Sequence, residues 1–120
     1  MAFRFPGSGL PNWQEMDRDI DRTIEAALIV PVETLTASAS VSPFSGLVLV
    51  DTTSGSVTVS LPPAANCKGQ VLHIKKLVAA NTMTIDPDGT ETIDGAATVA
   101  STTQYISYTI ISDGAGWLII

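Results

Sequence analysis

Four acidic side chains crowd one turn region, and they are the densest group of residues in the chain that could do chemistry: Asp86, Asp88, Glu91 and Asp94. Oxygen ligands at this density could bind calcium. Their spacing lacks the EF-hand pattern, however, and Asp beside Pro and Gly is typical of a turn. The sequence therefore favours turn-forming and solubilising roles for these residues, and we predict neither a metal site nor another cofactor.

Two single residues are the remaining candidates for chemistry. His73 is the only histidine, which excludes a two-histidine metal site, and its apolar neighbours make it a strand residue. A catalytic histidine needs a positioned nucleophile and an orienting carboxylate, which nothing nearby indicates. Cys67 lies beside Lys68, which could lower the thiol pKa mildly, but an unreactive loop cysteine is the favoured interpretation. No catalytic residue is predicted, and an enzyme ranks third among the functions considered.

Charge and composition argue against two classes of partner, nucleic acids and membranes. The 120 residues carry a formal net charge of −6, and the isoelectric point is about 4.4. Such a chain repels the phosphates of nucleic acids. A single cysteine excludes an internal disulfide framework, and the sequence shows no signal-peptide pattern and no apolar run long enough to cross a bilayer. We therefore expect no nucleic-acid or membrane partner, and synthesis in a reducing cytoplasm.

The elements that would position these residues are short strands. From 47 to 120, stretches of Thr, Ser, Val and Ile alternate with turns that carry Gly and Asp, which is typical of a β module. Strands are expected at about 47–53, 56–61, 70–77, 82–85, 103–112 and 117–120, with a strand or bend at 92–99. Ser54-Gly55 is expected to turn between the first two. The predicted fold is mainly β, a small C-terminal antiparallel β-sandwich or barrel preceded by an N-terminal arm and one short α-helix.

Residues 1–30 are expected to form that arm and helix. Pro and Gly interrupt any regular element in 1–11, although this stretch carries two Phe residues and one Arg, types that are common at interfaces. Asn12 then caps a helix expected from Trp13 to about Leu28 or Ile29, which Pro31 ends. The helix has an apolar stripe that needs a covering surface, either its own β domain or a partner. Residues 31–46 are predicted to be a linker with room for one edge strand.

The last strands suggest association between copies of the chain. Large side chains fall on both faces of 105–110, and the closing Trp-Leu-Ile-Ile carries no charged side chain. A small free monomer would be too apolar there, so we expect a homotrimer. The residues predicted for its interface are Tyr105, Tyr108, Ile110, Trp117 and Ile119.

Five short motifs follow one another along the last 70 or so residues. They are Val50-Asp51-Thr52-Thr53-Ser54-Gly55-Ser56-Val57-Thr58-Val59-Ser60-Leu61-Pro62, Lys68-Gly69-Gln70-Val71-Leu72-His73-Ile74-Lys75-Lys76, Asn81-Thr82-Met83-Thr84-Ile85, Thr92-Ile93-Asp94-Gly95 and Ser112-Asp113-Gly114-Ala115-Gly116-Trp117. In this order they resemble a β module of tailed-bacteriophage virion proteins. That module is found in tail fibres, head fibres and capsid decoration (cement) proteins, commonly as trimers. The resemblance implies a virion structural protein.

The length of the chain favours a decoration protein over a tail fibre. A receptor-binding fibre usually needs a shaft of repeats and a tip domain, for which 120 residues without repeats leave no room. We therefore expect a decoration protein on the outer surface of the head that binds the major capsid protein and stabilises the shell. The alternative is a tail-fibre module or a receptor- or glycan-binding module that uses exposed aromatics. The residues predicted to bind the capsid are Phe3, Arg4, Phe5, Leu10, Trp13, Met16, Ile20 and Ile24.

Overall fold

A computed structural model describes residues 30–43 and 46–120, and the compact β unit that it contains spans Pro31–Ile120. Its elements are nine strands and one 3-10 turn: β1 Val32–Leu35, β2 Ala39–Ser40, β3 Leu47–Val50, β4 Val57–Ser60, η1 Ala64–Asn66, β5 Val71–Lys76, β6 Met83–Asp86, β7 Val99–Ser101, β8 Ser107–Ser112 and β9 Trp117–Ile119. The protein is thus mainly β, as predicted. No α-helix occurs in these two ranges, and the helix expected at 13–29 lies outside them.

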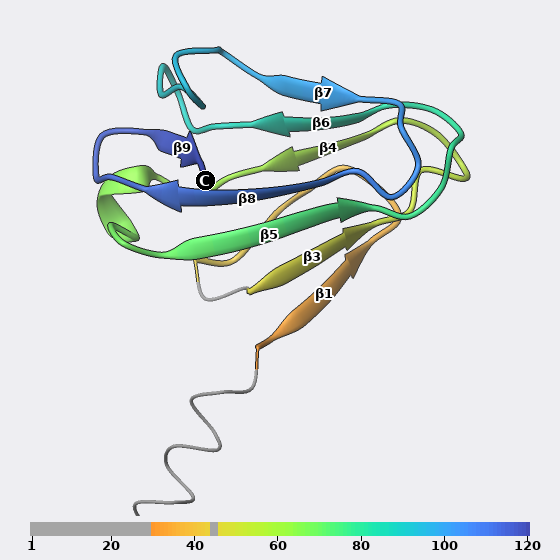
Figure 1. Ribbon diagram of the computed structural model, residues 1–120, viewed down its shortest axis with the longest axis horizontal. Coiled ribbons are helices and arrows are strands. Elements are labelled where there is room, and N and C mark those ends of the chain that lie inside the picture. Colours follow the sequence, from red (N-terminus) through yellow and green to blue (C-terminus); the bar gives the residue numbers. More distant parts are fainter. Residues whose placement is uncertain (1–29, 44–45) are drawn as a thin grey trace, which may run out of the picture. The chain divides into compact units, whose positions relative to one another are not determined.

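The strands form two sheets, each with both parallel and antiparallel pairs (Figure 1). Sheet A has the order β1-β3-β5-β8-β9, and sheet B has the order β2-β4-β6-β7. From β1 to β6, successive strands belong alternately to sheet A and sheet B. Each strand is parallel to the preceding strand of its own sheet. This is the winding of a parallel β-solenoid. Antiparallel pairs are β5 with β8, β6 with β7 and β8 with β9. The predicted antiparallel arrangement is therefore wrong for the pairs among the first six strands, which are all parallel.

The connection between β3 and β4 shows why that prediction failed. Ser54-Gly55 does bend the chain, and the Gly55 amide donates to the Thr52 carbonyl. The two strands flanking this bend nevertheless belong to different sheets, so they do not form a hairpin. A short gap with Gly is a hairpin signal only when the flanking strands pair with each other.

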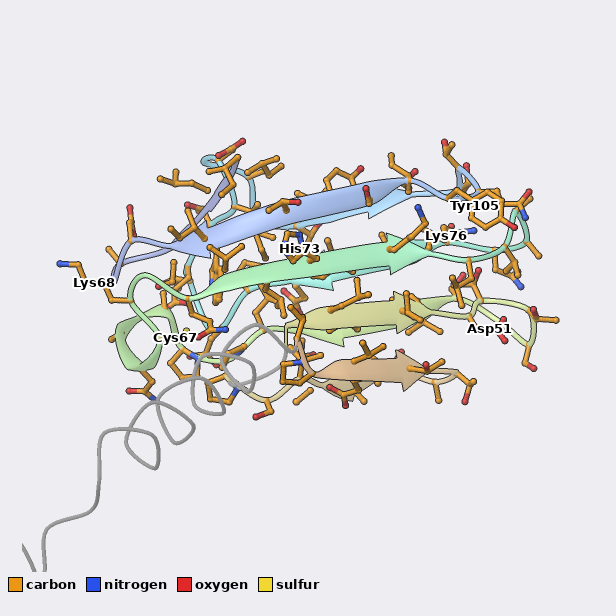
Figure 2. All side chains as sticks on the ribbon, turned by 60° about the horizontal axis from the view of Figure 1, so that its bottom comes forward. Asp51, Cys67, Lys68, His73, Lys76 and Tyr105 are labelled. Carbon is orange, nitrogen blue, oxygen red and sulfur yellow. The ribbon has the colours of Figure 1, made fainter. Side chains whose placement is uncertain are left out.

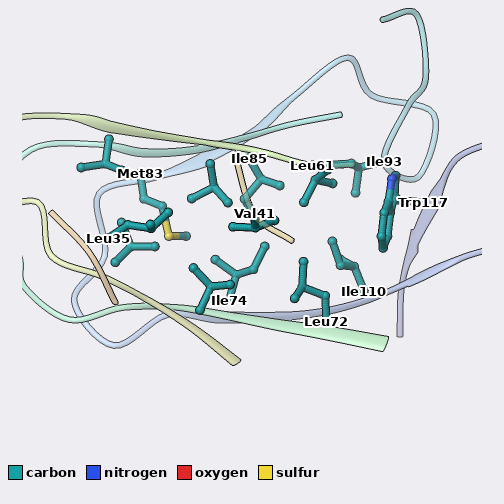
Figure 3. Close-up of a cluster of buried hydrophobic side chains, with 14 of the residues drawn as sticks. Leu35, Val41, Leu61, Leu72, Ile74, Met83, Ile85, Ile93, Ile110 and Trp117 are labelled. Carbon is teal, nitrogen blue, oxygen red and sulfur yellow. The ribbon is translucent and has the colours of Figure 1, made fainter. Parts of the chain in front are cut away.

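One hydrophobic core lies between the two sheets. Along β4 the side chains alternate between buried and half-buried, and β3 and β5 repeat this pattern. Successive strand side chains point to opposite faces, so one half of each strand enters the core. Val57, Val59 and Leu61 lie on the buried side. Figure 3 shows Trp117 closing one end of this core beside Ile93.

Residues 31–46 are part of the β unit, which corrects their assignment as a linker. They contain β1 and β2, which form one edge of each sheet. Leu35 and Val41 enter the core with exposed fractions of 7% and 4%. The Pro31 carbonyl accepts from the Gly46 and Leu47 amides at 3.2 and 2.9 Å, which fixes the start of β1 against β3. The domain boundary thus lies near residue 31 and not near 47.

Candidate interaction surfaces

The outer face of sheet A, called face A here, carries aliphatic side chains around a polar centre. Leu47 and Leu49 alternate with the buried Val48 and Val50, and Leu47 is level with Val32 on β1 and His73 on β5. The same alternation places side chains of β5, β8 and β9 on this face, and the Ile120 amide continues the β9 pairing by donating to the Thr109 carbonyl. The aliphatic residues of face A are Val32, Leu47, Leu49, Val71, Ile111, Leu118 and Ile120.

The outer face of sheet B, called face B, has a different composition. It presents Thr58 and Ser60 from β4 and Thr84 and Asp86 from β6, which are paired in register. Both sheets bury the same kinds of side chains on their inner faces. The domain's own core therefore does not explain why one outer face carries aliphatic side chains and the other carries hydroxyl groups.

Polar side chains occupy the middle of face A, at His73 and Lys75 on β5 and at Ser107 and Thr109 on β8. His73 Nδ1 and Thr109 Oγ1 are hydrogen-bonded across β5 and β8 at 3.0 Å, in the middle of the sheet. The Lys75 ammonium lies 5.6 Å from the centroid of the Tyr105 ring, near the end of the strands. His73, the only histidine, is therefore held by a hydroxyl group and not by a carboxylate.

A buried lysine organises the loops at one end of the sheets, where Figure 2 shows Asp51, Lys76 and Tyr105. Lys76 is fully buried on the core side of β5. Its ammonium donates to the carbonyls of Val78 and Ala80, the latter at 3.1 Å. Thr52 Oγ1 also donates to the Ala80 carbonyl. These donors satisfy inward-facing carbonyls of the 77–82 loop, so the lysine acts as a structural clamp.

Tyr105 stands exposed on this end of the molecule. Its side chain is 60% exposed, and its backbone has a positive φ of 62°, which is unusual for a bulky residue. The Tyr105 amide donates to the Lys76 carbonyl at 2.8 Å, and Gln104 Nε2 donates to the Leu77 carbonyl at 3.3 Å. The ring is thus presented on a turn that is tied to the clamped loop.

Two of the acidic residues considered for calcium, Glu91 and Asp94, accept hydrogen bonds from backbone amides. The Ala64 amide donates to both carboxylate oxygens of Glu91 at 3.1 Å, and the Ile119 amide donates to Asp94 Oδ1 at 3.0 Å. No three His, Cys, Asp or Glu side chains in the part of the chain that the structure describes are grouped so that they could hold a metal ion. Glu91 thus joins its loop to η1, and Asp94 joins its loop to β9.

Cys67 lies at the opposite end of the sheets (Figure 2). It is a free, buried cysteine whose thiol donates to the Pro63 carbonyl at 3.3 Å. Burial raises the pKa of the Cys67 thiol, and the negative charge of Glu91 adds to the rise. A raised pKa means less thiolate, so the arrangement opposes nucleophilic chemistry at this position.

The structure separates the residues that the sequence grouped as an oligomer interface. Ile110 and Trp117 are 0% and 2% exposed and belong to this chain's own core, so they are not available to a partner. Tyr108 is half-buried and packs against that core. Tyr105 is exposed, and Ile119 is 37% exposed at the edge strand β9. On β8, Tyr108 and Ile110 therefore face the core, whereas Ile111 lies on face A.

The sequence did not predict that the residues of face A lie together, although one of its strands was recognisable. The apolar run at 47–50 leaves no polar side for β3, which indicates cover on both faces. The residues predicted to bind the capsid lie outside the described ranges: Phe3, Arg4, Phe5, Leu10, Trp13, Met16, Ile20 and Ile24.

No known protein family matches this chain, and no curated protein matches it significantly in sequence. Within residues 30–43 and 46–120, no helix has the length and apolar character needed to cross a membrane.

Proposed function

We propose that this chain is a structural protein of a tailed-bacteriophage particle, a decoration protein that binds the major capsid protein on the outside of the head as a homotrimer and stabilises the shell. The proposal starts from the order of short motifs shared with virion β modules. The structural observation that carries it is face A. The exposed aliphatic side chains of Val32, Leu118 and Ile120 on this face suit assembly better than the binding of a polar substrate.

The polar side chains at the loop end support the same proposal. Lys76 and Thr52 direct their donors at backbone carbonyls, and Asn81 Nδ2 donates to the Thr52 carbonyl at 2.8 Å. These groups hold loops in place and make a rigid module. A decoration protein needs such a module together with a segment that grips the shell.

Residues 1–30 provide that segment in this proposal. Phe3 and Phe5, with Arg4 between them, precede the apolar stripe of the expected helix, and aromatic and Arg side chains dominate the energetics of many interfaces. The β unit begins at Pro31 and is compact by itself. Attachment and assembly are thereby assigned to different parts of the chain.

Addition of the purified protein to particles that lack it tests the proposal. We expect saturable binding in electron micrographs and increased resistance of the particles to heat or osmotic shock. The double substitution Phe3→Ala/Phe5→Ala should leave the β unit folded and abolish incorporation. Particles that gain no protein from a folded, wild-type preparation would contradict the assignment to the head.

One observation favours glycan binding as a second candidate. Of the three aromatic residues in the described ranges, Trp117 lies in the core and Tyr108 packs against it, whereas Tyr105 is exposed on a turn that is hydrogen-bonded to the 76–77 backbone. Aromatic faces contribute to many ligand sites. Saturable binding of the protein to host polysaccharide that Tyr105→Ala abolishes would favour this candidate.

A further inference from the structure

Asp-Gly pairs occur three times in the sequence, at Asp88-Gly89, Asp94-Gly95 and Asp113-Gly114. In such a pair the glycine amide nitrogen can attack the aspartate side-chain carbonyl carbon, because glycine has no Cβ atom to hinder the approach. We propose that Asp88 is a site of covalent self-modification, at which the chain isomerises to isoaspartate, and that the fold protects the other two pairs. This inference goes beyond the proposed function and does not depend on it.

The reaction is intramolecular and needs only water. The Gly89 nitrogen forms a bond to Cγ of the protonated Asp88 carboxyl group and loses its proton, and one carboxyl oxygen leaves as water, which closes a succinimide ring. Water then adds to either ring carbonyl. Cleavage of the bond between the nitrogen and Cγ restores aspartate. Cleavage of the original peptide bond gives isoaspartate, in which the main chain runs through Cβ and Cγ, and the water taken up balances the water lost.

Both reacting groups of the Asp88-Gly89 pair are free. The two residues are exposed in the turn after β6, and within 30–43 and 46–120 neither the Asp88 carboxylate nor the Gly89 amide has a hydrogen-bond partner. A Cβ atom at Gly89 would meet nothing within 4 Å, so the space around this peptide is open. The carboxyl group can therefore reach an attack geometry without breaking a hydrogen bond of either reacting group.

Both reacting groups of the Asp113-Gly114 pair are engaged. Asp113 Oδ1 accepts from the Ala115 and Gly116 amides at 2.9 and 2.8 Å. The Gly114 amide, which would be the nucleophile, donates to Ser112 Oγ at 3.1 Å. The bonds to the carboxylate also lower the pKa of Asp113, so less of this group is in the neutral form from which water leaves. Attack at Asp113 requires these bonds to break first.

The Asp94-Gly95 pair lies on a tightly held turn. Asp94 Oδ1 accepts from the Ile119 amide at 3.0 Å, and the Asp94 amide donates to the Trp117 carbonyl at 3.0 Å. Reciprocal backbone bonds between Ile93 and Ala96, at 2.8 and 2.9 Å, close the turn. The carboxylate must leave β9 before it can react, so isomerisation at Asp94 waits for local opening of the structure.

The test compares the three pairs within one sample of the full-length chain. The protein is incubated at mildly acidic pH, below its unfolding temperature, and isoaspartate at each pair is then measured in peptide digests by electron-transfer mass spectrometry, which distinguishes the two linkages. A parallel sample in guanidinium chloride lacks the fold. In the folded protein we expect isoaspartate at Asp88 to form about ten-fold faster or more than at the other pairs, whose carboxylates must first lose charge-assisted hydrogen bonds. In denaturant the three rates should converge.

Asp88→Glu is the control variant, because its longer side chain must close a larger ring. It should abolish the signal from the turn after β6 and leave the rates at the other two pairs unchanged, with circular dichroism to show that the variant is folded. Equal rates at the three pairs of the folded protein, or a faster rate at Asp94 or Asp113, would overturn the inference. So would a preference for Asp88 that persists unchanged in guanidinium chloride, because the local sequence and not the fold would then set it.

Discussion

Lys76 places an ammonium group at the end of a hydrophobic core, where its partners are backbone carbonyls. We expect Lys76→Met, which keeps the length of the side chain, to lower the free energy of unfolding by about 1–3 kcal/mol, because the Val78 carbonyl loses its donor. Urea denaturation measures this loss, and backbone NMR should show changes in the 77–82 loop.

Lys75→Met is the matched control. The Lys75 ammonium lies over the exposed Tyr105 ring, so its loss should lower the free energy of unfolding by less than about 1 kcal/mol. Equal, small losses for the two variants would show that the clamp does not stabilise the loop.

Trp117 combines a large buried ring with an unsatisfied polar group. Its Nε1 is buried and has no hydrogen-bond partner among the described residues. Trp117→Ala should cost about 3–5 kcal/mol through the cavity that it creates. Trp117→Phe should cost clearly less, because it keeps an aromatic ring and removes the unpaired N–H. Thermal or urea unfolding compares the two, and a Phe variant as unstable as the Ala variant would contradict this account of the site.

Two aspartates at the surface should titrate below the usual carboxyl range. Hydrogen bonds from the Ala115 and Gly116 amides lower the pKa of Asp113, and hydrogen bonds from the Thr53 hydroxyl and amide lower the pKa of Asp51. A depressed folded-state pKa stabilises the protein above the unfolded value of 3.8, and this stabilisation disappears as pH falls through the folded pKa.

Carboxyl carbon NMR should therefore give midpoints below 3.8 for both groups. The advantage of the wild-type chain over Asp113→Asn in unfolding free energy should shrink across that same interval. If the stability difference between the wild-type chain and Asp113→Asn grew as the pH fell below 3.8, this prediction would be contradicted.

Among the elements, β9 depends on close contact with the 92–94 segment. The Trp117 amide donates to the Thr92 carbonyl, and the Asp94 amide donates to the Trp117 carbonyl. A Cβ atom at Gly116 would lie 3.1 Å from the Thr92 carbonyl oxygen, so Gly116→Ala must push β9 away from this backbone. We expect a loss of about 1–3 kcal/mol in unfolding free energy.

Gly55→Ala provides a control in a turn with open space. Nothing lies within 4 Å of a Cβ there, and we expect a change within about 1 kcal/mol. If both alanine variants unfold at the same denaturant concentration, the close approach at Gly116 is not a constraint.

The strands themselves could be predicted from sequence, and their pairing could not. Alternation of Val with Thr or Ser located β4 within a residue, because burial of one face imposes that pattern. Parallel pairing joins Leu47 to Val32 and to His73, intervals of 15 and 26 residues. Unequal intervals leave no repeat to detect, so the winding has no local signature. Face A was hidden for the same reason, since its residues meet only through this pairing.

At the scale of the whole molecule, β1 and β2 should be needed for a stable domain. A fragment of residues 31–120 should unfold cooperatively. A fragment of 47–120 should be markedly less stable, because it loses Leu35 and Val41 from the core and exposes β3 and β4 as new edges. Thermal unfolding of the two fragments tests this, and equal melting temperatures would restore the linker interpretation of 31–46.

The pairing of β8 with β5 has a consequence for the order of folding. Val71 pairs with Ile111, so the centre of sheet A joins residues 40 positions apart, across the intervening β6 and β7. Contacts of such long sequence separation slow folding, because a large loop must close before any contact forms. On the ribosome, sheet A cannot be completed until β8 and β9 have emerged, and until then β5 has an open edge toward other nascent chains. Expression at high density should therefore favour aggregation over assembly, and lower temperature or slower synthesis should raise the soluble yield.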